Sequence, residues 1–197
     1  GGAIASDGLG YNGAHSTIRI DDSTISGNRA TSNGGGFALN ASSDADVRNS
    51  TISGNIAGNY GGAFATIGSG SDVQLLNSTV LHNQAQHGGA VYYSGNLPVV
   101  ANTIFAYNSG GNCASSGISW VYAGGHNIAD DMTCNLNHNA VSNPGNLEGV
   151  DPLVAALSDN GGSTQTHMLL PSSPAIDHVQ PANCILAADQ RQLSPRG

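Results

Sequence analysis

The chain repeats one phrase three times, as Asp22-Ser-Thr-Ile-Ser-Gly-Asn28, Asn49-Ser-Thr-Ile-Ser-Gly-Asn55 and Asn77-Ser-Thr-Val-Leu-His-Asn83. A second phrase accompanies it, as Gly34-Gly-Gly-Phe37, Gly61-Gly-Ala-Phe64 and Gly88-Gly-Ala-Val91. Both phrases return every 27 or 28 residues, and a weaker copy of the first, Ala101-Asn-Thr-Ile104, follows them. Two phrases that keep one period indicate a solenoid, a propeller or a linear array.

The residues between these phrases favour strands over helices. The segments 17–21 and 44–48 alternate apolar and polar residues with a period of two, and turn-forming residues bound them. A helical repeat would place apolar residues three and four positions apart, and a propeller blade needs about 40 residues. We therefore predict an all-β fold, a single-stranded parallel β-helix (solenoid) with three short strands in each coil of about 24–28 residues.

The composition agrees with a turn-rich fold and excludes several classes of protein. Of the 197 residues 28 are Gly, and the five basic residues are all Arg and lie scattered, so no nucleic acid partner is expected. No apolar run is long enough to span a membrane. From residue 143 onward Pro recurs and interrupts regular structure. We expect one domain, in which residues 1–142 form the coils and residues 143–197 form an irregular, cap-like segment packed on the same solenoid.

Aligning the repeats sorts the apolar side chains into columns that face the interior. The predicted columns are Ile18, Ala45, Val73 and Leu97, then Ile20, Val47, Leu75 and Val99, then Ile25, Ile52, Val80 and Ile104. Polar residues fall between these columns, as the pleat of a strand requires. The opposite charges of Arg19 and Asp46, and of Asp21 and Arg48, should then face each other across adjacent coils as ordinary cross-strand pairs.

Polar residues also recur at fixed positions of the repeat. Stacked amides should form a structural ladder that satisfies turn carbonyls from coil to coil, through Asn28, Asn55, Asn83 and Asn108. Aligned hydroxyls suggest an ice-binding face as a less favoured alternative, through Thr24, Thr51, Thr79 and Thr103. Three positions match the N-glycosylation pattern, and the repeat phrase itself supplies two of them: Asn40, Asn49 and Asn77.

The C-terminal half carries longer motifs that do not repeat. They are Asn112-Cys113, Gly125-His-Asn-Ile128, Asp151-Pro-Leu153, Asp159-Asn-Gly-Gly162, Thr164-Gln-Thr-His167, Pro171-Ser-Ser-Pro-Ala-Ile-Asp177 and Asp189-Gln-Arg191. Together with the repeats, these motifs resemble the bacterial choice-of-anchor Q β-helix proteins over nearly all of the chain. The resemblance implies an exported right-handed β-helix that is attached to the cell surface, and no enzymatic activity belongs to that family as such.

The export that this resemblance implies bears on the three cysteines, because disulfides form in oxidising compartments. We predict a disulfide between Cys113 and Cys134, which would close a loop where the regular coils end, and a free thiol at Cys184.

Few residues suggest catalysis or metal binding. Asp44 and Asp72 align on adjacent coils and form a weak candidate pair for a cation, although two solvated turn residues are the simpler interpretation. No pair of histidines has zinc-ligand spacing, and the Gly-x-Ser-x-Gly motif of serine hydrolases is missing. We therefore assign no catalytic residue, no metal site and no cofactor.

These observations predict a non-catalytic structural or adhesive protein that is secreted or held at the cell surface. Its first residues, Gly1-Gly-Ala-Ile4, open in phase with the repeat and would leave the edge of the first coil uncovered. We therefore expect copies of the chain to stack end to end as a homopolymer, such as a surface filament, with surface glycans as a second class of partner. The alternative is a polysaccharide lyase or hydrolase, or a glycan-binding β-helix.

Overall fold

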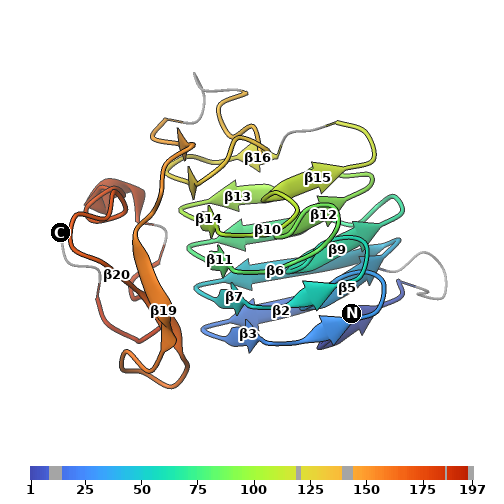
Figure 1. The fold of residues 1–197 in the computed structure, drawn as a ribbon, viewed down its shortest axis with the longest axis horizontal. Helices are drawn as coiled ribbons and strands as arrows, with labels where there is room; N and C mark the ends of the chain where they lie inside the picture. The colour runs from blue at the N-terminus through green and yellow to red at the C-terminus, as the bar shows by residue number, and fades with distance from the viewer. Residues whose placement is uncertain (9–14, 119–120, 139–143, 185, 195–197) are drawn as a thin grey trace.

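Figure 1 shows a computed structural model of the chain, which describes residues 1–8, 15–118, 121–138, 144–184 and 186–194. Short parallel strands stack into three sheets that wrap around one interior. Each coil contributes one strand to each sheet, so the predicted all-β parallel solenoid with three strands per coil is confirmed. Four regular coils are followed by a shortened fifth.

The three sheets are named here in the order in which the chain enters them. Sheet A consists of β1 (Ile4–Ser6), β5 (Phe37–Asn40), β9 (Phe64–Ile67), β12 (Val91–Tyr93) and β15 (Cys113–Ser115). Sheet B consists of β2 (Ser16–Asp21), β6 (Ser43–Arg48), β10 (Val73–Leu76), β13 (Val99–Ala101) and β16 (Tyr122–Ala123). Sheet C consists of β3 (Thr24–Ser26), β7 (Thr51–Ser53), β11 (Thr79–Leu81), β14 (Ile104–Ala106), β17 (Ile128–Ala129) and β18 (Leu147–Glu148). A short extra pair, β4 (Arg29–Ala30) and β8 (Ile56–Ala57), joins the first two coils.

The glycine phrase lies at the turn that enters sheet A, where backbones of successive coils approach closely. A Cβ on Gly35 would lie 2.3 Å from the carbonyl oxygen of Gly62, and one on Gly62 would lie 2.2 Å from that of Gly89. No side chain fits at such distances, so the repeat must place glycine there. This close approach is the physical reason why the phrase recurs in register with the coils.

The interior consists of stacked apolar side chains from the three sheets. Phe37 and Phe64 stack with ring centroids 4.9 Å apart, and Val47 and Leu75 are fully buried on sheet B. The predicted columns hold through the first three coils, because Ile20 pairs with Val47 and Val47 with Leu75. In sheet C, Ile25, Ile52 and Val80 are aligned in the same way.

The fourth coil departs from the predicted columns by one residue. Leu75 pairs with Val100 and Val80 pairs with Phe105, so these two buried residues replace the predicted Val99 and Ile104. The prediction aligned Thr103 with the threonines of the earlier coils. In the structure Thr79 pairs with Ile104, and the Thr103 hydroxyl accepts the backbone N–H of Ser78 at 3.4 Å. A slip of one residue exchanges the inner and outer faces of a strand, so Val99 and Ile104 belong to the outer faces of sheets B and C.

The charged residues of sheet B pair along the strands. Arg19 and Asp46 are register partners as predicted, and so are Asp21 and Arg48. The ion pairs nevertheless form within each strand, between Arg19 and Asp21 at 2.5 Å and between Arg48 and Asp46 at 2.7 Å. Residues two positions apart lie on the same face of a strand, so an ion pair within the strand can form as readily as the cross-strand ion pair that we expected.

Two ladders of polar side chains run from coil to coil at the turns. The predicted ladder is confirmed, because Asn55 Nδ2 donates to Asn83 Oδ1 at 2.9 Å and Asn83 Nδ2 donates to Asn108 Oδ1 at 3.1 Å. It begins at Asn28 and continues beyond the prediction through Asn112 to Asp130. A second ladder, which we did not predict, satisfies backbone N–H groups between sheets B and C through Ser50, Ser78, Thr103, Asn127 and Asn146.

The fifth coil is closed by the chain that follows it. The predicted disulfide between Cys113 and Cys134 is present and Cys184 is free. Cys134 and Leu136 are buried in the interior at this end, and Glu148 accepts the N–H of Leu136 at 2.7 Å. The boundary that we expected between residues 142 and 143 lies outside the described residues, and β18 extends sheet C to Glu148.

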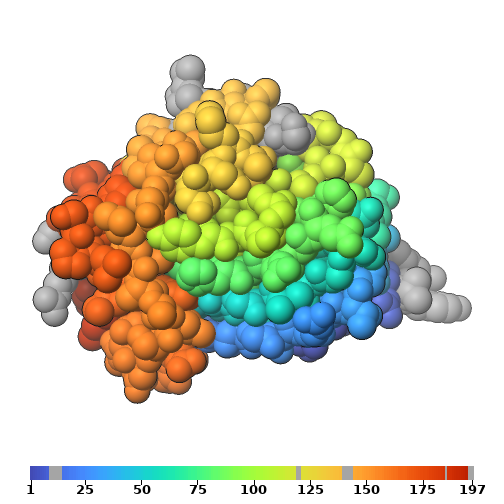
Figure 2. Space-filling model, viewed as in Figure 1, coloured from blue at the N-terminus to red at the C-terminus, as the bar shows by residue number. Residues whose placement is uncertain are grey.

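After β18 the chain leaves the stack and runs alongside it (Figure 1). Residues 151–194, called the C-terminal segment here, contain the antiparallel strands β19 (Val154–Ser158) and β20 (Thr166–Leu169) and a short 3₁₀ turn at Pro181–Asn183. The segment lies across the coils on the side of sheet C and is packed on the solenoid as expected, although its position is lateral and not at an end (Figure 2). No helix in the part of the chain that the structure describes is long and apolar enough to cross a membrane.

Candidate functional site

The candidate site is the junction between the outer face of sheet C and the C-terminal segment. Polar contacts reach this segment from the first, second and fourth coils. Thr24 donates to the carbonyl of Gln165 at 2.6 Å, Thr51 to Gln190 at 2.7 Å, and the hydroxyl of Tyr107 to Asp151. Three of these groups belong to the motifs that carry the family resemblance.

Gln190 is the central docking residue. Its side chain is 8% exposed and accepts the Thr51 hydroxyl, while its amide nitrogen donates to the Ser23 carbonyl at 3.1 Å and to Thr24 Oγ1 at 2.9 Å. The neighbouring Asp189 shapes the loop, because its carboxylate accepts the Arg191 backbone N–H at 2.8 Å and binds the Arg191 guanidinium at 2.6 Å. The Asp189-Gln-Arg191 motif is thus a docking element.

His167 on β20 joins the C-terminal segment to the second coil. Its Nδ1 lies 2.7 Å from the carbonyl oxygen of Ala155, so that nitrogen carries a proton and donates. Its Nε2 lies 2.9 Å from Ser53 Oγ and therefore accepts the hydroxyl proton. Burial lowers the pKa of His167, which favours the neutral ring that this pattern needs.

Tyr107 forms a further contact at the fourth coil. Its ring stacks on His82 with centroids 5.1 Å apart, and its hydroxyl binds Asp151. Burial and the bond to Asp151 raise the pKa of Tyr107 to about 12. The same bond lowers the pKa of Asp151, so the carboxylate is held ionised at neutral pH.

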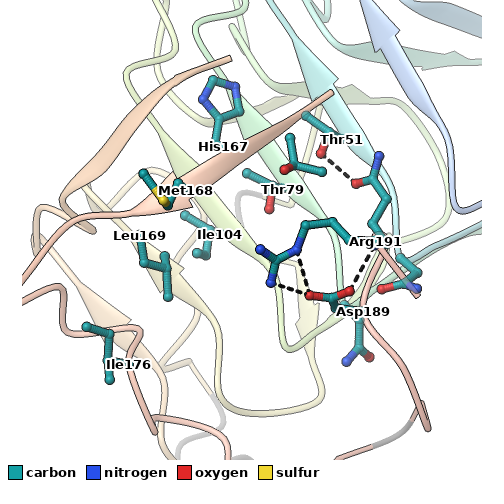
Figure 3. Close-up of a pocket in the computed structure, with 13 residues that line it drawn as sticks. Thr51, Thr79, Ile104, His167, Met168, Leu169, Ile176, Asp189 and Arg191 are labelled. Atoms are coloured by element: carbon teal, nitrogen blue, oxygen red, sulfur yellow. Dashed lines mark hydrogen bonds and ion pairs between the residues drawn. The ribbon is translucent and has the colours of Figure 1, made fainter. Parts of the chain in front are cut away.

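A groove remains between the two parts where they do not touch (Figure 3). One cavity of about 470 Å³ is lined by Thr51, Thr79 and Ile104 from sheet C and by β20 and residues 189–191 opposite. A second cavity of about 430 Å³ shares Asn77 and Leu169 with the first and continues toward Cys184. Because the two cavities share lining residues, they adjoin along the junction.

The groove combines polar groups with a larger apolar surface and carries little net charge. Asp189 and Arg191 neutralise each other, and Thr79 supplies a hydroxyl next to the apolar Ile104 and Ile176. The carbonyl oxygen of the Asn77 side chain is shielded from solvent and has no hydrogen-bond partner in the described structure. Because this oxygen is shielded, a ligand in the groove would instead meet the Thr79 hydroxyl and the apolar side chains around it.

The contact between Ser53 and His167 resembles a nucleophile beside a general base, oriented by the Ala155 carbonyl. The Ser53 side chain is however only 4% exposed beneath the C-terminal segment, and the adjacent Gly54 N–H already donates to Leu81. A substrate carbonyl cannot reach the hydroxyl in this arrangement. The geometry supports a docking contact.

The predicted candidate residues have different places in the structure. Asp44 and Asp72 adjoin, and Asp44 accepts the N–H of Asp72 at 3.0 Å and lies 3.2 Å from His15, while Asp72 accepts from Asn96. No group of three residues with metal-ligating side chains occurs in residues 1–8, 15–118, 121–138, 144–184 and 186–194. The ice-binding interpretation is wrong for the threonine column, because Thr51 is 2% exposed under the C-terminal segment and Thr103 lies in another ladder.

Sequence reasoning missed the docking role of Gln190, His167 and Tyr107. The two ladders depend on residues about 27 apart, whereas Gln190 and Thr51 are separated by 139 positions and follow no period. The only signal for this junction is the clustering of polar motifs after Asp151.

Comparison with known proteins adds no further identification of the chain. No protein-family model matches the sequence, and neither a curated protein nor a solved structure is significantly similar to it.

Proposed function

We propose that the chain is a non-catalytic structural or adhesive module that works outside the cell. The observation that carries this proposal is the continuity of the stack, in which the interior and both ladders run through the successive coils. Such a stack holds its outer surfaces in fixed positions, as a scaffold requires. The disulfide between Cys113 and Cys134 supports an oxidising, extracellular environment.

Adhesion is tested directly with beads coated with the chain and offered to surfaces that carry bacterial or plant polysaccharides. We expect the folded chain to retain beads under flow and the heat-unfolded chain to lose this retention. Release of reducing ends or of unsaturated products from the same polysaccharides would contradict the non-catalytic proposal and support the lyase or hydrolase alternative.

The self-stacking proposal needs both ends of the solenoid to accept another copy. Within the described residues no strand pairs with the outer edges of β1, β2 and β3, whereas Cys134 and Leu136 fill the interior at the fifth coil. Head-to-tail growth requires two complementary ends, so we place the adhesive surface on the sides of the solenoid. Light scattering across a concentration series should find particles of constant mass, and filaments that lengthen with concentration would restore the stacking proposal.

A second candidate function is binding of a neutral glycan in the groove. The lining favours it, because the apolar face of a sugar ring can lie against Ile104 and Ile176 while the Thr79 hydroxyl bonds a sugar hydroxyl. Replacing Thr79 with Val should weaken glycan binding measured by calorimetry, and replacing the exposed Thr31 with Val should not. Equal binding by both variants would remove the groove as the binding site.

A further inference from the structure

Two histidine pairs cross the junction between the solenoid and the C-terminal segment. His82, which follows β11, lies 5.7 Å from His167 on β20, measured between ring centroids. His126, which precedes β17, lies 5.7 Å from His178. In each pair one ring belongs to a coil and the other to the C-terminal segment, so four of the chain's seven histidines meet at one junction.

The docking contacts use ring nitrogens that accept hydrogen bonds. His167 Nε2 accepts from Ser53, because Nδ1 already donates to the Ala155 carbonyl. His126 Nε2 accepts the side-chain N–H of Asn183, a residue of the C-terminal segment, at 2.9 Å. Only a neutral imidazole has an acceptor nitrogen. Protonation therefore removes one inter-segment acceptor from each pair and places two positive rings close together.

The charged groups around the pairs do not compensate that charge directly. His82 faces Tyr107, whose hydroxyl binds Asp151 and whose backbone N–H donates to Asp130. His178 Nε2 donates to the Gly145 carbonyl at 2.6 Å, and His126 Nδ1 is buried without a partner in the described structure. Among the described residues, no carboxylate oxygen lies within 4.0 Å of a ring nitrogen of these four histidines, whereas His15 has Asp44 at 3.2 Å.

We propose that His82, His167, His126 and His178 form a pH-sensitive clasp that holds the C-terminal segment on sheet C at neutral pH and releases it in mildly acidic medium. The docked state binds fewer protons than the released state at His167, because the contact with Ser53 uses its neutral ring. Docking therefore weakens as the pH falls below about 6.5, where free histidine takes up its proton. Release widens the groove and uncovers Leu81 and Thr51, which are otherwise buried.

Burial supports this direction at one of the four rings. It lowers the pKa of His167, and the proximity of His82 adds to the lowering, against the bond to Ala155, which raises it. A histidine whose pKa is lower when docked stabilises docking above its free pKa, and this contribution is lost as the pH falls through the docked value.

Amide hydrogen exchange of β19 and β20 tests the clasp, because an isolated two-stranded hairpin is at most marginally stable once released. Rates are normalised to those of the unfolded chain at each pH. Between about pH 7.5 and about pH 5.5 we expect the protection of these strands to fall by about tenfold, the size of effect expected when a hydrogen bond across the junction is lost. Protection of β6 in the solenoid should stay constant.

Matched variants separate the clasp from general acid sensitivity. His82 and His126 both have positive φ, of 57° and 54°, which Asn tolerates, so the double variant His82→Asn/His126→Asn removes one ring of each pair with little backbone strain. We expect the fall in protection between the two pH values to be smaller in this variant than in the wild-type chain. The control His87→Asn changes an exposed ring beside Tyr60, and we expect wild-type behaviour.

A fixed charge provides the converse test. His82→Arg should loosen β19 and β20 even at about pH 7.5, because Arg keeps its charge there. Equal protection of these strands at both pH values in the wild-type chain would overturn the proposal. An undiminished pH dependence in the double variant would overturn it as well.

Discussion

Gln190 shows how one side chain joins segments that are distant in the chain. Its amide contacts Thr51 and Ser23, which lie 139 and 167 positions earlier. Because Gln has both a donor and an acceptor at its tip, it satisfies a Thr hydroxyl and a strand carbonyl together. A shorter or apolar side chain at this position would leave those groups buried without partners.

We expect Gln190→Ala to lower the free energy of unfolding by about 1–3 kcal/mol, because buried polar groups lose their partners. The exposed Gln180, whose amide bonds only within the C-terminal segment, serves as the control, and Gln180→Ala should change stability by less than about 0.5 kcal/mol. Urea unfolding followed by circular dichroism measures both. Equal effects of the two variants would show that Gln190 is not the docking residue.

Val99 and Val100 test the register of the fourth coil as adjacent residues of one type. Val100 is fully buried opposite Leu75, so Val100→Asp should destabilise the chain by more than about 4 kcal/mol through an unpaired buried carboxylate. Val99 faces outward, and Val99→Asp should cost about 1 kcal/mol from lost strand propensity. A lower thermal midpoint for Val99→Asp than for Val100→Asp would support the predicted column, in which Val99 faces the interior.

At the scale of elements, the asparagine ladder adds side-chain hydrogen bonds to the backbone bonds that join successive turns. Asn83 is fully buried, donates to the Ile52 and Leu81 carbonyls, and accepts from Asn55. The Asn83 amide thus satisfies one carbonyl of the coil before it and one carbonyl of its own turn. The recurring Asn position of the repeat therefore forms a continuous line of hydrogen-bonded amides along the stack.

Asn83→Ala should therefore cost about 3 kcal/mol or more, because several buried groups lose partners in one substitution. Asn59, which is exposed and donates weakly to Ser32 at 3.4 Å, gives the matched control, and Asn59→Ala should be nearly neutral. The unfolding temperatures of the two variants, measured by calorimetry, test this expectation. A neutral Asn83→Ala would mean that the ladder does not stabilise the stack.

The disulfide acts on the fifth coil, where regular pairing becomes short. Cys134→Ala should lower the free energy of unfolding by about 3 kcal/mol, as the chain-entropy estimate for a loop of this size gives. Cys184→Ala removes the free thiol and should leave stability unchanged. Peptide mapping without reductant should recover the 113–134 linkage, and a linkage to Cys184 would contradict it.

At the scale of the whole molecule, the stack was predictable and its lateral docking was not. Columns such as Ile20, Val47 and Leu75 follow from a period of about 27 residues, because the same geometry selects the same residue type in every coil. The fourth coil was misaligned because Thr103 matched the earlier threonines by identity and not by position. The docking of Gln190 and His167 follows no period, since each contact forms once.

The lateral position of the C-terminal segment also has a consequence for cooperativity. In an unbraced solenoid each coil contacts only its neighbours, so the terminal coils fray first and the stack can lose them one at a time. Here the same segment holds Thr24 in the first coil and Tyr107 after the fourth. Fraying of the first coil would break contacts of the same C-terminal segment that also holds the fourth coil. We therefore expect this segment to make the solenoid unfold as a single unit.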